Sequence, residues 1–175
     1  MFIEASFSKI FLAPLGAECE ALVANTFSRI YIQTVFAVSS RQSLIRPEFK
    51  EDLYKYVSGI VTNQGHKLIA INGVTDHVHI LIGLKPAMAL ADLVREIKAD
   101  STNFVNKNKW VHGRFSWQEG YGAFSYGHSQ LDTIIRYIQN QEKHHKRSSF
   151  RKEYLTLLRR FDIAFEAKYV FEFIR

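Results

Sequence analysis

The sequence predicts an α+β domain of the ferredoxin-like kind, an antiparallel sheet with both of its helices on one face. Three observations support this fold class. Segments with strand and helix patterns follow one another in the order β-α-β-β-α-β from residue 29 to residue 126. Each helical segment has one apolar face, and two strand segments are separated only by Thr75-Asp76, which predicts a hairpin. With 175 residues, 47% of them hydrophobic, the chain can bury the core of one such domain.

The first elements follow an N-terminal segment that has no clear pattern. We treat residues 1–28 as an extension of uncertain structure in front of a single domain over residues 29–175. Residues 29–38 are rich in β-branched and aromatic side chains and predict a strand. Pro47 stands at the favoured first position of a helix, and Gly65 occupies the position of its C-terminal cap.

The middle of the chain predicts the hairpin, a second helix and a fourth strand. The hairpin strands are Lys67–Val74 and His77–Leu84. Apolar residues at helical spacing then predict a helix over Ala89–Lys107. Residues 115–118 and 123–126 flank a glycine-containing segment, so we expect the fourth strand to be bent or broken.

Two further helices are predicted beyond the sheet. The first begins near Ser129, where Ser129 and Asp132 have the spacing of a capping box. A second helix covers residues 150–161, and the tail from Phe161 to Ile174 is partly strand-like. The buried stripe of the first of these helices consists of Leu131, Ile134, Ile135 and Ile138.

The charge distribution indicates a polyanionic partner. The chain has a net charge of +6 and a pI near 9.4. Residues 136–160 contain eight basic and two acidic residues, so this segment carries the whole excess of positive charge. A phosphate-binding surface is the favoured interpretation, and a solvated basic helix face is the alternative.

The cysteine count and the hydropathy pattern limit the location of the protein. Cys19 is the only cysteine, which excludes a disulfide framework and a cysteine-based zinc site. No apolar run approaches the length of a membrane span. We therefore expect a cytoplasmic protein that does not enter a membrane.

His77 and His79 form a candidate metal site on the third strand. Successive side chains of a strand point to opposite faces, so these two share a face, with Cα atoms about 6.5 Å apart. We expect them on the face of the sheet that the helices leave open, where both imidazoles can reach one divalent ion. Val78 and Ile80 then point to the buried face. Asp76 is a candidate to orient His77, although a role in the turn is the favoured interpretation.

Tyr137 and Gln141 lie one helical turn apart and share a face that differs from the buried stripe. A tyrosine beside a core stripe is usually a boundary residue that packs its ring. The position of Tyr137 alone therefore does not indicate catalysis.

Together with two further motifs, the histidines resemble a known family. The motifs are His77-Val78-His79, the segment WQEGYGAFS at residues 117–125, and YIQNQEKHH at residues 137–145. In this order and spacing they closely resemble the single-tyrosine HUH transposases of the smallest bacterial insertion sequences, which include REP-associated tyrosine transposases. The resemblance extends from about residue 29 to the C-terminus.

The resemblance implies a mechanism and a set of site residues. His77, His79 and Gln141 would bind a Mg²⁺ or Mn²⁺ ion, and Tyr137 would attack the scissile phosphate to form a 5′-phosphotyrosine bond. The protein would bind the hairpin ends of an insertion sequence and cut and rejoin single-stranded DNA without ATP. It would act as a homodimer, in which the tyrosine helix can complete the site of its own subunit or that of the other.

The basic helical segment supplies the candidate DNA contacts. Phosphate contacts of this kind position DNA without reading its sequence. The His144-His145 pair is interpreted as phosphate-binding or structural, in preference to metal-binding. Four aromatic residues could stack on unpaired bases, although most aromatics at such spacing belong to a core; they are Trp110, Trp117, Tyr121 and Phe124. The candidate phosphate contacts are Lys143, His144, His145, Lys146, Arg147, Arg151 and Lys152.

Three other functions fit parts of the pattern. A domesticated hairpin-binding protein would not need Tyr137 or the histidines, which are all present. Other HUH nickases commonly carry a third histidine in the metal motif or a second tyrosine, whereas here Gln141 follows Tyr137 by four residues. A metal-dependent hydrolase of a small phosphoester would not need the basic segment 136–160.

Overall fold

The computed structural model describes residues 27–166 and residue 170. The predicted extension over residues 1–28 lies almost entirely outside this part of the chain, so the division at residue 28 stays a prediction. The elements in chain order are β1 (Ile30–Ala37), a short 3-10 turn (Ser39–Arg41), α1 (Pro47–Asn63), β2 (Lys67–Gly73), β3 (His77–Leu84), α2 (Leu90–Lys107), β4 (Gly122–Tyr126), a second 3-10 turn (His128–Gln130), α3 (Leu131–Gln139), α4 (Gln141–His145) and α5 (Phe150–Arg160).

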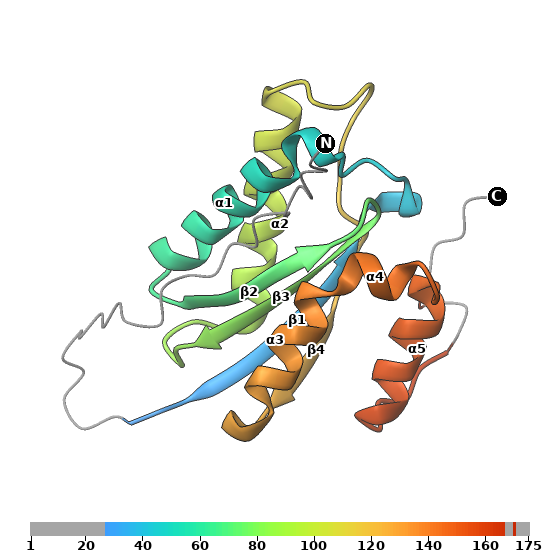
Figure 1. The fold of residues 1–175 in the computed structure, drawn as a ribbon. Coiled ribbons are helices and arrows are strands. Elements are labelled where there is room, and N and C mark those ends of the chain that lie inside the picture. Colours follow the sequence, from blue (N-terminus) through green and yellow to red (C-terminus); the bar gives the residue numbers. More distant parts are fainter. Residues whose placement is uncertain (1–26, 167–169, 171–175) are drawn as a thin grey trace, which may run out of the picture.

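The four strands form one antiparallel sheet in the order β2-β3-β1-β4 (Figure 1). This order and the β-α-β-β-α-β sequence of elements confirm the predicted ferredoxin-like fold. β3 lies between β2 and β1, where Val35 of β1 is paired with His79. The two histidines therefore stand on a strand that is hydrogen-bonded on both sides, which fixes the direction of their side chains.

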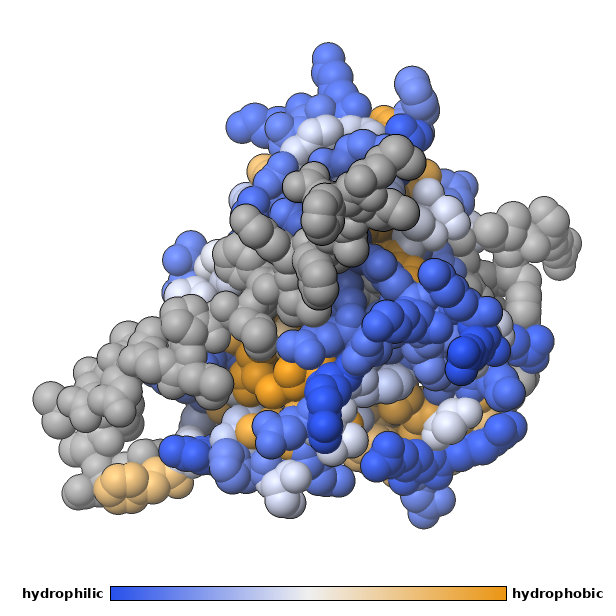
Figure 2. All heavy atoms as spheres, in the orientation of Figure 1, coloured by the Kyte–Doolittle hydropathy of each residue, from blue (hydrophilic) through white to orange (hydrophobic). Residues whose placement is uncertain are grey.

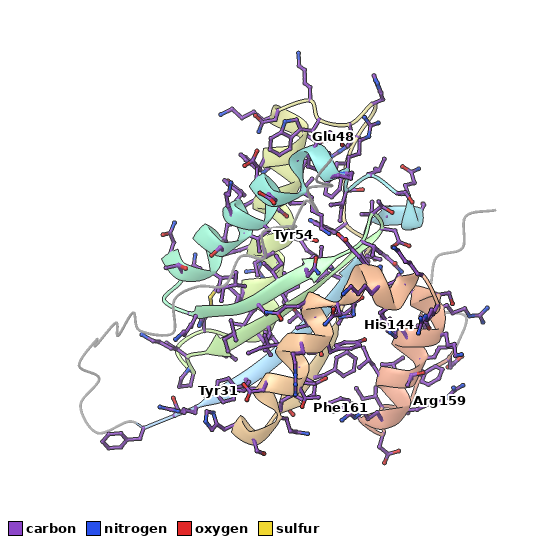
Figure 3. The ribbon with its side chains drawn as sticks, viewed as in Figure 1. Tyr31, Glu48, Tyr54, His144, Arg159 and Phe161 are labelled. Carbon is purple, nitrogen blue, oxygen red and sulfur yellow. The ribbon has the colours of Figure 1, made fainter. Side chains whose placement is uncertain are left out.

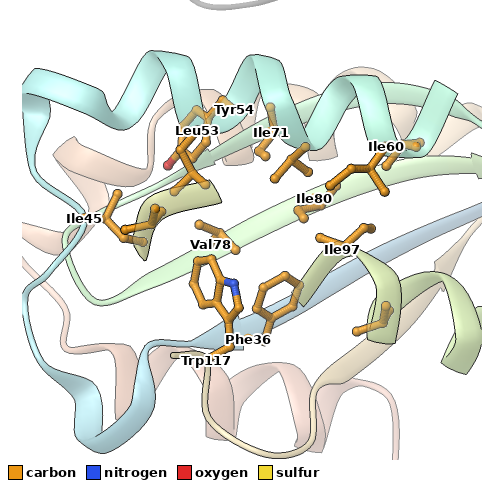
Figure 4. Packing of buried hydrophobic residues seen from close by; sticks show 14 of the residues in the cluster. Phe36, Ile45, Leu53, Tyr54, Ile60, Ile71, Val78, Ile80, Ile97 and Trp117 are labelled. Carbon is orange, nitrogen blue, oxygen red and sulfur yellow. The ribbon is translucent and has the colours of Figure 1, made fainter. Parts of the chain in front are cut away.

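One face of the sheet packs against α1 and α2. Alternate residues of β3 (Val78, Ile80 and Ile82) point into this core and are almost completely buried. Figure 4 shows Val78 beside Phe36 and Trp117, with Leu53 of α1 above them. Each buried side chain of this size contributes about 1.5–3 kcal/mol by leaving water, so this core anchors the strand that carries the histidines.

The other face of the sheet is covered by the C-terminal helices, with α3 and α4 running across it and α5 beside them (Figure 1). A second core forms here from buried residues of β1, β3, α3 and α5, among them Val35, Leu81, Ile138 and Leu157. The expectation that the histidines look out from an open face is therefore wrong. The hydrophobic faces of α3 and α5 need an apolar partner, and this face of the sheet provides it.

Polar contacts dock α3 and α4 onto the hairpin. The amide nitrogen of Asn72 donates to the carbonyl oxygen of Gln139 at 2.9 Å. Lys50 donates to the carbonyl oxygen of Gly73 at 2.8 Å and to Glu142 at 2.7 Å, so one side chain joins α1, β2 and α4. These contacts fix the end of α3 against the turn that precedes His77.

The helix that carries the tyrosine differs from its prediction at both ends. It begins after the 3-10 turn His128–Gln130, and the Gln130 side chain accepts from the Gly127 N–H at 2.8 Å. The predicted capping box of Ser129 and Asp132 is wrong, because Ser129 lies inside this turn and not at the cap position. At the other end Asn140, with φ −93° and ψ 17°, separates α3 from α4.

The remaining expectations concern the fourth strand and the tail. Only the second half of the predicted fourth strand forms a strand, β4. Trp117 in its first half forms an isolated bridge with Val38, as expected for a broken strand. Residues 161–166 are turn and coil, and most of the rest of the predicted strand-like tail is outside the described residues. None of the helices in the described part of the chain is long and apolar enough to cross a bilayer.

Candidate active site

The two strand histidines lie beneath the C-terminal helices. His77 and His79 point to the same side of β3, and the centroids of their rings are 5.2 Å apart. Both side chains are completely buried. The ring of His77 stacks on Phe150 of α5 at 4.1 Å between centroids, and the ring of His79 meets Tyr137 of α3 at 5.8 Å. The fold thus brings the predicted histidines and the predicted nucleophile together within one chain.

The outer nitrogen of each imidazole is held by a neighbouring side chain. His77 Nδ1 lies 2.7 Å from Asp76 Oδ1, so the carboxylate orients this ring as well as standing in the turn. His79 Nδ1 lies 2.8 Å from the amide of Gln33, which in turn accepts from the hydroxyl of Tyr126 at 2.8 Å. Such outer contacts fix the tautomer and the direction of metal-binding imidazoles.

The inner nitrogens face a carboxylate. His77 Nε2 and His79 Nε2 lie 3.6 and 3.5 Å from Glu153 Oε2, and neither nitrogen has a hydrogen-bond partner. Burial lowers the pKa of His79 to about 4, so its imidazole is neutral at pH 7. Burial also opposes charge on His77, but its bonding to Asp76 and the nearby Glu153 carboxylate outweigh burial and raise its pKa.

Glu153 is the centre of the polar cluster. Its side chain is buried on α5. Oε1 accepts hydrogen bonds from the Tyr137 hydroxyl and from Gln141 Nε2, the latter at 2.8 Å, and Oε2 lies 2.8 Å from His145 Nε2. Burial alone would raise the pKa of this carboxyl, but the surrounding imidazoles hold it well below its usual range. Glu153 is therefore an anion at neutral pH.

Tyr137 is held with its hydroxyl on this anion. Burial, followed by the negative charge of Glu153, raises the pKa of its phenol above the usual value of 10.0. The hydroxyl is therefore protonated at neutral pH. A cation beside Glu153 would offset the negative charge and favour the phenolate.

The structure brings Gln141 into the same cluster, although the chain is not one continuous helix from Tyr137 to Gln141. Gln141 is the first residue of α4 and is completely buried. Its amide nitrogen contacts Glu153, while its amide oxygen has no hydrogen-bond partner. An unpartnered buried oxygen is free to act as a ligand.

The buried cluster has the composition of a divalent metal site. His77, His79, His145 and Glu153 each offer one ligand atom, and these four atoms lie within 4.8 Å of one another. Two unpartnered imidazole nitrogens directed at a carboxylate are costly to bury in the absence of a cation. The residues therefore fit a metal ion with mixed nitrogen and oxygen ligands.

The predicted DNA contacts divide into two groups. Five side chains are exposed around α4 and the start of α5: Lys143, Lys146, Arg147, Arg151 and Lys152. The other two candidates, His144 and His145, are half-buried, and both direct Nε2 toward Glu153, at 3.6 and 2.8 Å. His144, labelled in Figure 3, lies between α4 and α5. His145 thus belongs to the polar cluster and not to the exposed basic surface.

Two hollows meet at Tyr137. One has a volume of about 730 Å³ and is lined by Arg136, Lys143, Lys146 and Arg147. The other, of about 420 Å³, extends between α3 and α5 to Lys152 and Arg160. Hydrophilic residues dominate the surface over α4 and α5 (Figure 2). Both hollows therefore connect Tyr137 to a surface that carries basic side chains.

The four aromatic candidates for base stacking are core residues. Trp117 and Phe124 are buried in the two cores, and Trp110 and Tyr121 are partly buried against the first core. The Trp117 N–H donates to Ser101 Oγ at 2.8 Å inside that core. We therefore do not assign stacking to these four residues.

Glu153 is the residue of the cluster that the sequence patterns did not predict. It lies three residues after Phe150 and four before Leu157, which places it on the apolar face of α5. A carboxylate on the buried face of a helix is uncommon unless it is paired. The position of Glu153 on the apolar helix face could therefore have identified it as a paired, buried residue. The net charge of the segment, in which one glutamate has little weight, does not identify it.

Comparisons with known proteins identify relatives of the chain. Residues 26–141 match the family described as "Transposase IS200 like". The chain is 22% identical over 112 residues to the ISDra2 transposase TnpA of Deinococcus radiodurans, a match that covers 61% of this chain and 80% of the relative.

Two solved structures are similar in fold. A crystal structure from Deinococcus radiodurans R1, described as that of a transposase, superposes with a TM-score of 0.55 at 22% identity and covers 67% of this chain and 95% of its own. A REP-associated tyrosine transposase bound to a REP hairpin gives a TM-score of 0.54 at 14% identity, covering 70% of this chain and 72% of its own. Both share the fold described above.

Proposed function

This chain belongs to the IS200-like transposase family, and on that premise we propose that it cuts and rejoins single-stranded DNA through a covalent bond between Tyr137 and a 5′ phosphate. One observation carries the proposal. The Tyr137 hydroxyl, the two strand histidines and Gln141 converge on one buried carboxylate, Glu153. A nucleophile beside a metal-binding cluster is the arrangement that phosphoryl transfer needs.

The proposed metal ligands are His77, His79 and Gln141, with Mg²⁺ or Mn²⁺ as the ion. The two unpartnered Nε2 atoms and the unpartnered amide oxygen of Gln141 support this assignment. When bound, the ion supplies Lewis-acid polarisation of the scissile phosphate and steadies the leaving oxygen. Asp76 and Gln33 hold the histidine rings from behind.

The proposed reaction exchanges one phosphoester for another. Tyr137 Oη forms a bond to phosphorus, and the bond from phosphorus to the 3′ oxygen breaks. The phenol loses a proton and the released 3′ oxygen gains one, so protons balance. The phosphotyrosine ester keeps the phosphodiester energy, and attack by another 3′ hydroxyl reverses the step on a new strand. The exchange therefore needs no ATP.

The proposed substrate is DNA with hairpin ends, as in the REP-hairpin complex of the structural relative. The exposed basic residues around α4 and the two hollows that meet at Tyr137 support a path for a phosphate backbone. These contacts would place the strand so that its scissile phosphate approaches the tyrosine. Sequence recognition is not assigned to any of them.

We also propose that the protein acts as a homodimer, as the family resemblance implies. Tyr137 already lies beside His79 of its own chain, so each subunit can assemble a site without exchanging α3. Co-expression of His77→Ala and Tyr137→Phe chains tests this arrangement. Mixed dimers should remain inactive, whereas recovered cleavage would indicate a tyrosine supplied by the other subunit.

A cleavage assay tests the proposed function. The full chain is incubated with a single-stranded hairpin oligonucleotide from the ends of its own element, with Mn²⁺ or Mg²⁺, and covalent adducts are separated on denaturing gels. We expect an adduct in wild type that EDTA abolishes and that Tyr137→Phe lacks. Tyr56→Phe is the matched control, because Tyr56 stacks on Phe104 away from the site.

The outcomes separate the alternatives. Cleavage by Tyr137→Phe without an adduct would indicate metal-activated water and contradict the tyrosine mechanism. Tight hairpin binding without any cleavage in wild type would indicate a domesticated DNA-binding protein.

A further inference from the structure

We propose that α4 and α5 complete the metal centre, with His145 and Glu153 binding the ion directly beside His77 and His79. This inference rests on the proposed function and adds two ligands to it. Both residues lie beyond residue 141, where the family match ends. The added ligands therefore come from a part of the chain that the shared family segment does not contain.

The distances within the cluster support direct ligation. Glu153 Oε2 lies 3.6 Å from His77 Nε2, 3.5 Å from His79 Nε2 and 2.8 Å from His145 Nε2. Ligands about 2.0–2.1 Å from one ion lie roughly 3–3.5 Å from each other. The three separations from the carboxylate oxygen are thus close to those of a common coordination sphere, and all four ligand atoms lie within 4.8 Å of one another.

The burial of the four groups points the same way. His77, His79 and Glu153 are buried, and His145 is half-buried. The His77 ring also packs on Phe150 of α5 and meets the ring of His145 at 4.5 Å, so aromatic rings exclude water from this part of the cluster. A carboxylate in such surroundings is stable only with nearby positive charge, which a divalent ion supplies in full.

Glu153 would also link the ion to the nucleophile. While Oε2 faces the histidines, Oε1 accepts from the Tyr137 hydroxyl and from Gln141. Glu153 is therefore a positioning residue for Tyr137 as well as a ligand. Gln141 orients the carboxylate through its amide nitrogen, and its oxygen stays available to the same ion.

The donor set has a consequence for the choice of metal. Mg²⁺ prefers oxygen ligands in octahedral geometry and is poorly served by three imidazoles. Mn²⁺ accepts mixed nitrogen and oxygen ligands. We therefore expect this chain to bind Mn²⁺ at least about 10-fold more tightly than Mg²⁺.

Metal titration of the full chain tests the inference without using activity. Metal-free protein is titrated with MnCl₂, and free Mn²⁺ is measured by electron paramagnetic resonance. Glu153→Gln and His145→Asn should each weaken Mn²⁺ binding at least about 10-fold. The matched controls are Glu51→Gln, whose side chain is exposed on α1, and His112→Asn on the surface. Both should bind Mn²⁺ as wild type does, and circular dichroism checks the folding of every variant.

A second measurement on wild type does not depend on any variant. Pulsed electron paramagnetic resonance of the Mn²⁺-loaded protein counts the coordinated imidazoles, and the inference predicts three. Two imidazoles, together with unchanged Mn²⁺ affinity in a folded Glu153→Gln, would overturn it.

Failure of the inference and failure of the proposed function have different signatures. If Glu153→Gln binds Mn²⁺ normally while wild type still forms the DNA adduct, the added ligands are wrong and the function stands. If three imidazoles bind Mn²⁺ but wild type forms no adduct, the metal centre stands and the tyrosine mechanism is wrong.

Discussion

At the scale of single residues, Glu153 connects the candidate metal cluster with the proposed nucleophile, Tyr137. Its carboxylate raises the pKa of the Tyr137 phenol, after the larger effect of burial. The same carboxylate lies 3.6 and 3.5 Å from the Nε2 atoms of the two strand histidines, where its negative charge would favour a cation. A bound ion would therefore change the charge that Tyr137 experiences, so that metal binding and activation of the tyrosine occur together.

The contact between the Gln33 amide and Nδ1 of His79 determines which imidazole nitrogen carries the proton. An amide can present either its nitrogen or its oxygen to Nδ1. Ligation through Nε2 requires a protonated Nδ1, and hence the amide oxygen of Gln33 as its acceptor. In the structure the amide nitrogen of Gln33 faces Nδ1 and its oxygen accepts from the Tyr126 hydroxyl. Ligation through Nε2 therefore requires the amide to turn over, after which its nitrogen would donate to the hydroxyl oxygen of Tyr126. This turn of the amide preserves both contacts.

Replacement of Gln33 tests this role. Gln33→Ala removes the partner of Nδ1, and we expect Mn²⁺ affinity to fall about 10- to 100-fold. Isothermal titration calorimetry measures the loss. Tyr126→Phe is the control, because it keeps the contact between Gln33 and His79, and it should change the affinity less. Equal losses in the two variants would show that Gln33 does not act through the tautomer of His79.

At the scale of elements, the hairpin turn between β2 and β3 fixes the position of the His77 backbone at the start of β3. A Cβ atom at Gly73 would lie 2.1 Å from the His77 carbonyl oxygen and 2.8 Å from Val78 Cα. These neighbours are backbone atoms and cannot move without shifting β3. Only glycine fits this close approach between the two strands.

Gly73→Ala is therefore expected to destabilise the protein by about 1–3 kcal/mol, the usual cost of overpacking, and to weaken Mn²⁺ binding. Urea denaturation measures the free energy of unfolding. Gly59→Ala in α1 is the matched control, because no atom lies within 4 Å of its added Cβ, and it should stabilise the protein by about 0.5–1 kcal/mol. A Gly73→Ala protein as stable as wild type would contradict the turn geometry.

The elements of the sheet could be predicted because their signals are local. The predicted strand over residues 29–38, the two hairpin strands and the first two helices agree with the structure to within a residue or two. Alternation, glycine at the end of α1 and proline at its start all act over a few residues. The shared face of His77 and His79 follows from the same alternation.

The cover over the histidines could not be predicted in the same way. It depends on α5 returning to the sheet after the break at Asn140, and contacts between Phe150 and His77 are distant in sequence. The helical period of residues 137–141 predicts a continuous helix, whereas the contact of Gln139 with Asn72 favours the break. Tertiary packing decided both features.

At the scale of the whole molecule, the excess positive charge lies beside the tyrosine. The segment over residues 136–160 holds it, and six of its eight basic residues line the two hollows at Tyr137. Positive charge in this position attracts a phosphate backbone and raises the rate of encounter. The opposite side of the sheet is covered by α1 and α2, in which acidic and basic residues are nearly equal in number.

Salt dependence measures the contribution of this surface. Lys146→Ala and Arg147→Ala should each weaken binding of hairpin DNA. Each should also reduce the slope of log affinity against log salt by about 0.7–0.9 for every phosphate that the variant no longer neutralises. Fluorescence anisotropy at several salt concentrations measures both quantities. Lys107→Ala at the end of α2 is the control and should leave the slope unchanged. Unchanged slopes in the α4 variants would place the DNA on another surface.

Mass spectrometry of the protein–DNA adduct tests the central claim most directly. The full chain is allowed to react with its hairpin oligonucleotide in Mn²⁺, digested with protease and nuclease, and sequenced by tandem mass spectrometry. The tyrosine mechanism predicts a nucleotide 5′ phosphate attached to Tyr137 in the peptide that contains Ile138 and Gln139. A nucleotide on any other residue, or cleaved DNA without a modified peptide, would contradict it.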